Sequence, residues 1–315
     1  MKLHIKPRRI RFLTTFYCNA KCPYCHNEGQ AVPVNSTMNE EFVGKLLDIV
    51  PTEEVILSGG EPTLNPHIVE IAKAVKERGI YLSITTNGTL TDRLYMLFPY
   101  LDEIKFNVDS LSKEAYEAIK QLPFEATIKN VMAAHNAGIY TKLNTPFISL
   151  ANAQELINFS DSTGVEIKFI EVLELGGFCD PSLEIIKLES LLKDNGYFLE
   201  KGDLKKTWKK GKNTITTMRC LCRAAVMTGD VDDAKELCRE QGSLYVTPNG
   251  EIKPCIYEEF SIPIYDSVMN GDLKTLQQKF EQFDQSFGIG LCQDIINKNH
   301  KFDIEKNEQK AAIRN

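Results

Sequence analysis

The first 175 residues alternate short apolar runs with longer amphipathic stretches. Short runs rich in branched and aromatic residues predict β-strands, whereas apolar residues spaced three or four apart predict helices. On this basis we predict six strands, at residues 9–15, 54–58, 80–85, 103–108, 139–148 and 165–172. Amphipathic helices are predicted between them, at residues 38–50, 66–78, 91–99, 112–121, 124–137 and 152–163.

Strands that are each joined to the next through a helix pair in parallel, by right-handed crossovers. Six such units are fewer than the eight of a closed barrel. The pattern therefore predicts an α/β fold, a partial and open (β/α)6 barrel of the TIM type. Functional side chains of such folds gather at the carboxyl ends of the strands.

The pattern changes after Gly176-Gly177. Helical pieces, a charged stretch at 201–212 and several cysteines follow, with a β-hairpin predicted by Asn249-Gly250 between two apolar runs. We therefore predict a barrel core at residues 1–175, a smaller C-terminal domain at 176–297 and a polar tail at 298–315.

Composition narrows the class of protein. The chain has 315 residues, 43% of them hydrophobic, and a formal net charge of −6, which argues against binding nucleic acid through a basic field. It shows neither a signal peptide nor an apolar run long enough to cross a membrane, so we expect no membrane partner and a cytoplasmic location. In that compartment nine cysteines indicate metal ligands rather than disulfides.

Three of these cysteines, Cys18, Cys22 and Cys25, lie in one loop directly after the first predicted strand. Structural zinc usually takes four ligands in two pairs, which this spacing does not supply. Three thiolates on a short loop instead fit three corners of a [4Fe–4S] cluster and leave one iron open for a small ligand.

This spacing resembles the signature of the radical S-adenosylmethionine (SAM) superfamily, and further motifs of that family follow in order. They are Tyr24, Ser58-Gly59-Gly60-Glu61-Pro62, Thr85-Thr86-Asn87-Gly88 and Asn107-Val108-Asp109-Ser110. The resemblance implies that Cys18, Cys22 and Cys25 hold the catalytic cluster, which cleaves SAM to a 5′-deoxyadenosyl radical that takes hydrogen from a substrate. It also implies a set of SAM-binding residues, namely Tyr24, Gly59, Gly60, Glu61, Thr86, Asn107, Ser110 and Leu173.

Within the superfamily, three segments resemble the GTP 3′,8-cyclases of molybdenum-cofactor synthesis. They are residues 25–29, Lys142-Leu-Asn144 and Lys168-Phe-Ile-Glu171. The resemblance implies substrate contacts at Arg11, Lys142 and Tyr245. Three arginines of that family are, however, replaced by Ile56, Ser243 and Tyr245, and the chain ends without the family's Gly-Gly. We therefore expect GTP to be a poor substrate.

The C-terminal cysteines resemble those of a SPASM or twitch domain, which holds an auxiliary iron–sulfur cluster. Cys238 precedes the predicted hairpin and Cys255 follows it, so the antiparallel arms bring them together. The resemblance implies a second [4Fe–4S] cluster with Cys238, Cys255, Cys292 and Cys222 among its ligands.

We interpret the chain as a radical SAM enzyme that acts on a small polar or anionic metabolite, such as a nucleotide or a sugar. Such an enzyme needs an electron donor, for example a flavodoxin or a ferredoxin. Within the class, the rivals are a GTP 3′,8-cyclase and a peptide maturase. About eight residues precede the first strand, which speaks against a fused leader-peptide-binding domain. Outside the class, the rivals are a non-catalytic iron–sulfur redox or sensing protein and a zinc module.

Overall fold

The computed structural model describes residues 2–6, 8–25, 37–172, 185–202, 205–219, 243–254 and 260–285. Over the first 170 residues, strands and helices alternate as the sequence predicts. The strands are β1 (Arg8–Leu13), β2 (Thr52–Ser58), β3 (Tyr81–Thr86), β4 (Glu103–Asn107), β5 (Tyr140–Pro146) and β6 (Glu166–Ile170). The helices are α1 (Glu40–Ile49), α2 (Ile68–Lys76), α3 (Thr91–Leu97), α4 (Lys113–Lys120), α5 (Phe124–Asn136) and α6 (Leu150–Thr163).

Side-chain caps fix where several helices begin. Asn39 accepts a hydrogen bond from the backbone N–H of Phe42 at the start of α1, and Ser112 and Ser149 do the same at α4 and α6. Such caps satisfy backbone donors that the first turn of a helix leaves free. Gly164 ends α6 with φ 78°, a conformation that glycine adopts without strain.

β1 to β6 are neighbours in one parallel sheet, and strands from later in the chain extend it at both edges. β10 (Leu244–Val246) pairs in parallel with β1, and β9 (Asn213–Met218) pairs in parallel with β6. Antiparallel strands follow outside them, β11 (Glu251–Lys253) and β12 (Ile262–Pro263) at one edge and β8 (Lys205–Lys210) and β7 (Phe198–Lys201) at the other. In the described part of the chain the two edge strands, β12 and β7, do not pair with each other, so the sheet stays open and the predicted partial barrel is confirmed.

The charged stretch at 201–212 carries strand β8 and part of β7, which the sequence analysis did not predict. Trp208 of β8 is buried and its indole N–H donates to Thr217 Oγ1 at 3.1 Å. Ile215 lies opposite Trp208 and is also buried. One buried apolar residue on each strand anchors this hairpin. The charged ends of the β8 lysines extend to solvent or to carboxylates, so they do not have to be buried with it.

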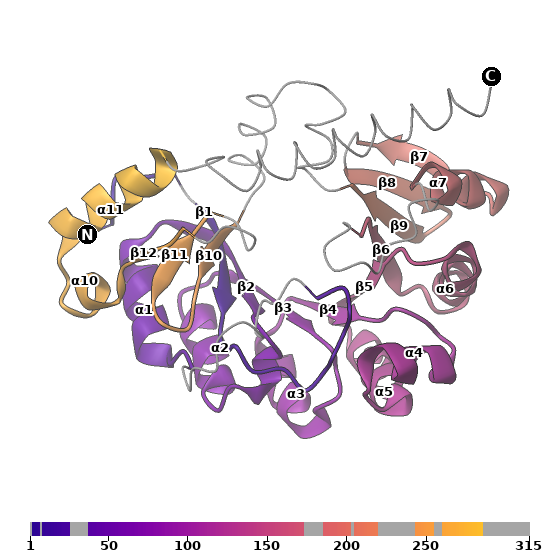
Figure 1. Cartoon of the computed structure of the whole chain (residues 1–315), viewed down its shortest axis with the longest axis horizontal. Coiled ribbons are helices and arrows are strands. Elements are labelled where there is room, and N and C mark those ends of the chain that lie inside the picture. The colour runs from indigo at the N-terminus through magenta and orange to yellow at the C-terminus, as the bar shows by residue number, and fades with distance from the viewer. Residues whose placement is uncertain are drawn as a thin grey trace, which may run out of the picture.

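The two faces of the sheet differ in character. Residues such as Ile10, Leu57, Ile84, Phe106 and Leu143 are fully buried and face the helices. Alternate residues point to the other side, because side chains of a strand alternate between faces, and many of them are polar. Figure 1 shows the helices α1 to α6 on the outer side of the curved sheet, which leaves the polar side as the barrel interior.

Three more helices complete the described structure. α7 (Ile185–Asp194) contacts α6, and α10 (Tyr265–Met269) contacts α1 and α11 (Leu273–Gln285). Strands on both sides of residue 175 share one sheet, and the division into a core, a smaller domain and a tail stays a prediction. Within the described residues no helix has the length and apolarity that crossing a bilayer requires.

Candidate functional site

The three cysteines of the first loop lie at the carboxyl end of β1, where the fold predicts function. Two backbone hydrogen bonds fasten this loop to the end of β2: Gly60 N–H donates to Thr15 O at 2.8 Å, and Glu61 N–H donates to Tyr17 O at 2.6 Å. A Cβ added at Gly60 would lie 2.0 Å from Tyr17 O, and one at Gly59 would lie 2.4 Å from Thr15 O. The glycine pair is therefore required so that the two backbones can meet.

Glu61 joins the end of β2 to the end of β3. Its Oε1 accepts from the Thr63 N–H at 3.1 Å, from Thr63 Oγ1 at 2.6 Å and from Thr86 Oγ1 at 2.7 Å. Its Oε2 accepts from the Asn87 N–H at 2.7 Å. Burial raises the pKa of this carboxyl group, and the four hydrogen bonds oppose that rise. Four bonds nearly fill the acceptor capacity of a carboxylate, so the Glu61 side chain holds the strand ends in place and has little capacity left to bind a ligand.

Tyr24, predicted to lie beside SAM, is fixed by residues at the end of β4. Its hydroxyl donates to Asp109 Oδ1 at 2.5 Å and to Asn107 Oδ1 at 3.2 Å. Asn107 in turn donates to the backbone carbonyl of Asn144 at 3.2 Å. The structure thus brings the predicted residues Tyr24 and Asn107 together with the cysteine loop.

The cysteines are partly buried and close enough to influence each other. Burial is the main cause that raises the pKa of the Cys18 thiol to about 11; a hydrogen bond from the Ala20 N–H opposes the rise, and the charges of Glu61, Cys22 and Cys25 add to it. Metal ligation requires thiolates. A cationic cluster would supply the opposite charge that the described surroundings of Cys18 lack.

Among the described residues, no three His, Cys, Asp or Glu side chains are close enough to hold a single metal ion. In a cubane cluster each thiolate binds its own iron, so the cysteines stand further apart than around one ion. Three cysteines on one loop therefore fit an iron–sulfur cluster better than zinc. Cys18, Cys22 and Cys25 would hold it, and the fourth iron would be open to SAM.

Polar atoms without a partner lie at the carboxyl ends of the neighbouring strands. The side-chain oxygens Thr85 Oγ1 and Asn144 Oδ1 are buried and accept no hydrogen bond from the described residues. Buried polar groups normally have partners. These two atoms are therefore suited to a polar ligand such as the amino acid part of SAM.

Ser110, also predicted to contact SAM, is fully buried. Its hydroxyl accepts from the Ser112 N–H at 3.1 Å and donates to Asn152 Oδ1 at 3.4 Å. Leu173 and the cysteines at 222, 238, 255 and 292 lie outside the described residues, as does any auxiliary cluster they hold. Their roles, like those of the other predicted site residues, stay predictions.

A ladder of ion pairs crosses the barrel interior near the amino ends of the strands. Arg9 pairs with Glu54 at 2.8 Å, Lys105 with Glu103 at 2.8 Å and with Glu54 at 3.7 Å. Lys142 pairs with Glu103 at 3.2 Å and with Glu166 at 3.4 Å. Burial alone would lower the pKa of Lys142, but a hydrogen bond with Tyr140 and the charges of Glu103 and Glu166 raise it above its usual range. Lys142, predicted to contact substrate, is thus largely neutralised by its neighbours.

Lys168 on β6 has no ion pair or hydrogen bond with any described residue. Burial and, after it, the like charges of Lys205, Arg11, Lys105 and Lys142 together lower the pKa of its ammonium group to about 7. The sequence motif Lys168-Phe-Ile-Glu171 contains this lysine, but no role was predicted for it. Lys168 lies in the middle of β6 (Glu166–Ile170), and its side chain alternates with the buried Ile167 and Phe169, which is the signal that could have identified it.

Arg11, the third predicted substrate residue with Lys142 and Tyr245, faces the same interior. Its guanidinium donates to Ser58 Oγ at 3.3 Å and lies 5.8 Å from the ring centre of Tyr245, while its Nε atom is buried without a partner. Its sheet neighbours are Ile56 on one side and Tyr245 on the other. Both are positions where the GTP 3′,8-cyclase resemblance expects arginine.

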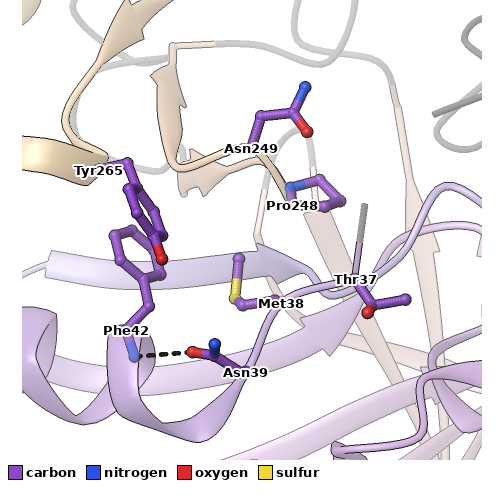
Figure 2. Close-up of a pocket in the computed structure, with 7 residues that line it drawn as sticks. All are labelled: Thr37, Met38, Asn39, Phe42, Pro248, Asn249 and Tyr265. Atoms are coloured by element: carbon purple, nitrogen blue, oxygen red, sulfur yellow. Dashed lines mark hydrogen bonds between the residues drawn. The ribbon is translucent and has the colours of Figure 1, made fainter. Parts of the chain in front are cut away.

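A separate cavity of about 370 Å³ lies between the start of α1 and the hairpin of β10 and β11. Figure 2 shows Phe42 and Tyr265 stacked at one side of it, with ring centres 5.2 Å apart, and Asn39 capping α1. None of the predicted site residues lines this cavity. It therefore marks the packing of the C-terminal strands on α1 and not the chemical site.

Comparison with known proteins identifies a matching family model and similar proteins. Residues 12–161 match the family model described as the radical SAM superfamily. The chain is 26% identical over 303 residues to a probable GTP 3′,8-cyclase of Methanothermobacter marburgensis, covering 89% of this chain and 96% of that protein. It is 27% identical over 312 residues to a probable GTP 3′,8-cyclase of Sulfurisphaera tokodaii, covering 94% and 95%.

Solved structures share the fold. SuiB of Streptococcus suis bound to S-adenosylmethionine matches with a TM-score of 0.64 at 16% identity, over 82% of this chain and 64% of SuiB. This chain therefore spans less than two thirds of SuiB. The enzyme anSMEcpe with bound AdoMet and a peptide matches with a TM-score of 0.56 at 16% identity, over 88% of this chain and 82% of that one. With the cysteine loop and the partial barrel, the match to the family model shows that residues 12–161 form a radical SAM domain, and the relatives indicate an iron–sulfur, SAM-dependent enzyme.

Proposed function

We propose that this enzyme takes a hydrogen atom from a phosphorylated nucleotide, bound in the barrel interior beside SAM. The names of the relatives support a nucleotide substrate. Both are probable GTP 3′,8-cyclases, and the match to this chain covers nearly their whole length. The electron that starts SAM cleavage would come from a small redox protein such as a flavodoxin or a ferredoxin.

The observation that carries the proposal is the unpaired charge of Lys168. Its pKa of about 7 reflects burial first and then four nearby cations, and no described carboxylate pairs with it. An anion that binds there would restore the charged form of the lysine, because an opposite charge at short range favours the ionised group. Phosphate is suited to the site, since Arg11 also presents donors to the interior.

The ion-pair ladder below supports the same conclusion. Glu103 is 5% exposed and, with Glu54 and Glu166, balances Arg9, Lys105 and Lys142. The ladder therefore forms a nearly neutral floor, and the net positive charge is left with Arg11 and Lys168. An anionic substrate would be held above this floor, toward the carboxyl ends of the strands and the cysteine loop.

A GTP 3′,8-cyclase is the second candidate, favoured by the named relatives. Against it, Ile56 and Tyr245 flank Arg11 in the sheet, so this edge has one cation where that family is expected to have three. Two cations suit fewer phosphate groups than a triphosphate requires. We therefore expect a mono- or diphosphate to bind better, relative to GTP, than in a true GTP cyclase.

The test is nucleotide-dependent SAM cleavage. Anaerobic, reconstituted protein would be reduced with dithionite and incubated with SAM and each of GTP, GDP, GMP, ATP and AMP. Formation of 5′-deoxyadenosine should rise severalfold with at least one nucleotide, and when that nucleotide is labelled with deuterium the label should appear in the 5′-deoxyadenosine. A Lys168→Met variant should lose this stimulation and keep the slow cleavage without substrate. If no nucleotide stimulates cleavage and a peptide or a sugar does, the proposed substrate class is wrong.

A further inference from the structure

Lys120 is a buried lysine whose position is not explained by the fold alone. It ends α4 and shares the buried face of that helix with Tyr116, one turn earlier. Its side chain has no exposed surface. A lysine is rarely buried completely unless a specific partner requires its charge.

The ammonium group of Lys120 points at the cysteine loop and the predicted SAM residues. Nζ donates to Tyr24 Oη at 3.0 Å and to Asn107 Oδ1, and it pairs with Asp109 Oδ2 at 3.1 Å. It also lies 3.6 Å from Cys22 Sγ, within hydrogen-bonding range of a sulfur acceptor. One cation thus joins α4, the end of β4 and a cluster cysteine.

The backbone repeats the connection. Lys21 N–H, next to Cys22, donates to the carbonyl of Lys120 at 3.1 Å. Cys18 and Cys22 also pack against the small apolar cluster of Ala20, Tyr116 and Leu122. The cysteine loop is therefore held at a fixed distance from the buried charge.

We propose that Lys120 is a positioning residue that holds Cys22 and, through its positive charge, favours the reduced form of the cluster. The inference rests on the assignment of the catalytic cluster to Cys18, Cys22 and Cys25. Reduction adds one electron to the cluster from an external donor. A permanent cation beside one thiolate stabilises the added negative charge, since the net charge and the hydrogen bonds at the sulfurs set the potential of such clusters. Asp109 works in the opposite direction, because its carboxylate repels the added electron.

The test is a redox titration of the reconstituted full-length protein, followed by electron paramagnetic resonance. The signal that changes when SAM is added identifies the catalytic cluster, and it is then titrated without SAM. Lys120→Met should lower the ratio of reduced to oxidised cluster at least tenfold at a given potential, which is 59 mV for a one-electron couple. Asp109→Asn should shift the potential the other way, and Lys120→Arg should stay near the wild type.

Two further variants separate tuning from folding. Lys113→Met removes a lysine from the exposed side of α4, where it pairs with Glu117 at 4.0 Å, and should leave the potential unchanged. Lys120→Met with Asp109→Asn leaves no buried charge unpaired, so it should assemble a cluster and titrate between the two single variants. An unchanged potential in Lys120→Met, or a double variant whose potential is not below that of Asp109→Asn, would overturn the inference, whatever happens to the melting temperature. Wild-type protein without any SAM-responsive cluster would instead overturn the proposed function.

Discussion

The carboxylate of Glu61 accepts a hydrogen bond from the backbone N–H of Asn87 at 2.7 Å, although the two residues are 26 positions apart. Through this bond the end of β2 fixes the end of β3, and the backbone of Gly60 and Glu61 fixes the cysteine loop. The predicted SAM-binding residues at the ends of β2 and β3 therefore depend on one buried side chain.

Glu61→Gln should destabilise the protein and weaken SAM binding together. The amide of glutamine replaces one acceptor by a donor, so at least one of the bonds from the N–H groups of Thr63 and Asn87 is lost. Losing a hydrogen bond to a charged group costs about 1.5–3 kcal/mol. Urea unfolding and SAM titration would measure the two effects. Glu77→Gln, at an exposed position after α2, serves as the control; equal losses in both variants would contradict the role of Glu61.

Gly60→Ala should prevent assembly of the catalytic cluster. The added Cβ would lie 2.0 Å from the carbonyl oxygen of Tyr17, a backbone atom that moves only if the cysteine loop moves. Iron and sulfide analysis after reconstitution would show the loss. Gly79→Ala is the matched control, because a Cβ there meets nothing within 4 Å and only the φ of 68° resists the change. Normal iron binding in Gly60→Ala would show that the loop is not fixed by this contact.

Substitution of Cys18, Cys22 or Cys25 by alanine should abolish 5′-deoxyadenosine formation with dithionite, since three thiolates hold the open-iron cluster. The triple variant should still bind about four irons if the C-terminal cysteines hold an auxiliary cubane. Iron analysis of the triple variant decides this point. Cleavage near the wild-type rate in any single variant would contradict the assignment of the catalytic cluster, and an iron-free triple variant would contradict the auxiliary cluster.

The central strands and the cysteine loop could be predicted from sequence because local patterns determine them. Apolar alternation marks β1 to β6, and the paired glycines 59 and 60 mark a close backbone approach. Strand β8 was not predicted, because four of its six residues are lysines and Trp208 is its single buried apolar residue, which is too little for an apolar strand pattern. A charged hairpin of this kind gains its stability from the sheet it extends, which a local pattern does not reveal.

Side-chain partnerships across the barrel were harder to predict. Lys142 resembled a phosphate ligand, yet its nearest charges are Glu103 and Glu166 on the flanking strands. Lys120 carries no sequence signal that distinguishes it from other helix lysines, and its role depends on the contact of α4 with the cysteine loop. In both cases the partner comes from another element, so only the register of the sheet and the packing of α4 reveal it.

Lys168 should make stability depend on pH near neutrality. Its pKa is about 7 in the folded protein and about 10.4 in an unfolded chain. Between these two pKa values the lysine is protonated in the unfolded chain and neutral in the folded protein, so the free energy of unfolding rises with pH by at most about 1.4 kcal/mol per pH unit. Below pH 7 the lysine is protonated in both states, and its destabilising effect on the fold has reached its full size. Urea unfolding of wild type and Lys168→Met at pH 6 and pH 9 would isolate this contribution by difference.

The same lysine should make anion binding depend on pH. Sulfate keeps its charge between pH 6 and pH 9, so only the protein titrates. Sulfate should raise the melting temperature more at pH 6, where Lys168 is protonated, than at pH 9, and Lys168→Met should lose this difference. An equal response of both proteins would show that Lys168 does not bind the anion.

The last prediction concerns GTP. We expect this enzyme to convert GTP to the cyclic pyranopterin precursor much more slowly than a true GTP 3′,8-cyclase. Ile56, Ser243 and Tyr245 stand where the family is expected to have arginines, and two of them flank Arg11 in the sheet. Each lost charge-assisted contact costs about 1.5–3 kcal/mol, so three losses would weaken triphosphate binding by several orders of magnitude if they add.

The measurement is the pterin formed after oxidation of a reaction with reduced protein, SAM and GTP. The matched variant is Ile56→Arg with Tyr245→Arg, which restores two cations beside Arg11 and should raise kcat/KM for GTP at least tenfold. GMP would serve as a control, because a monophosphate should gain less from the two arginines than a triphosphate. Wild-type turnover equal to that of a genuine cyclase would contradict the prediction. It would mean that Lys168 and the other interior cations already supply the contacts that the missing arginines make elsewhere.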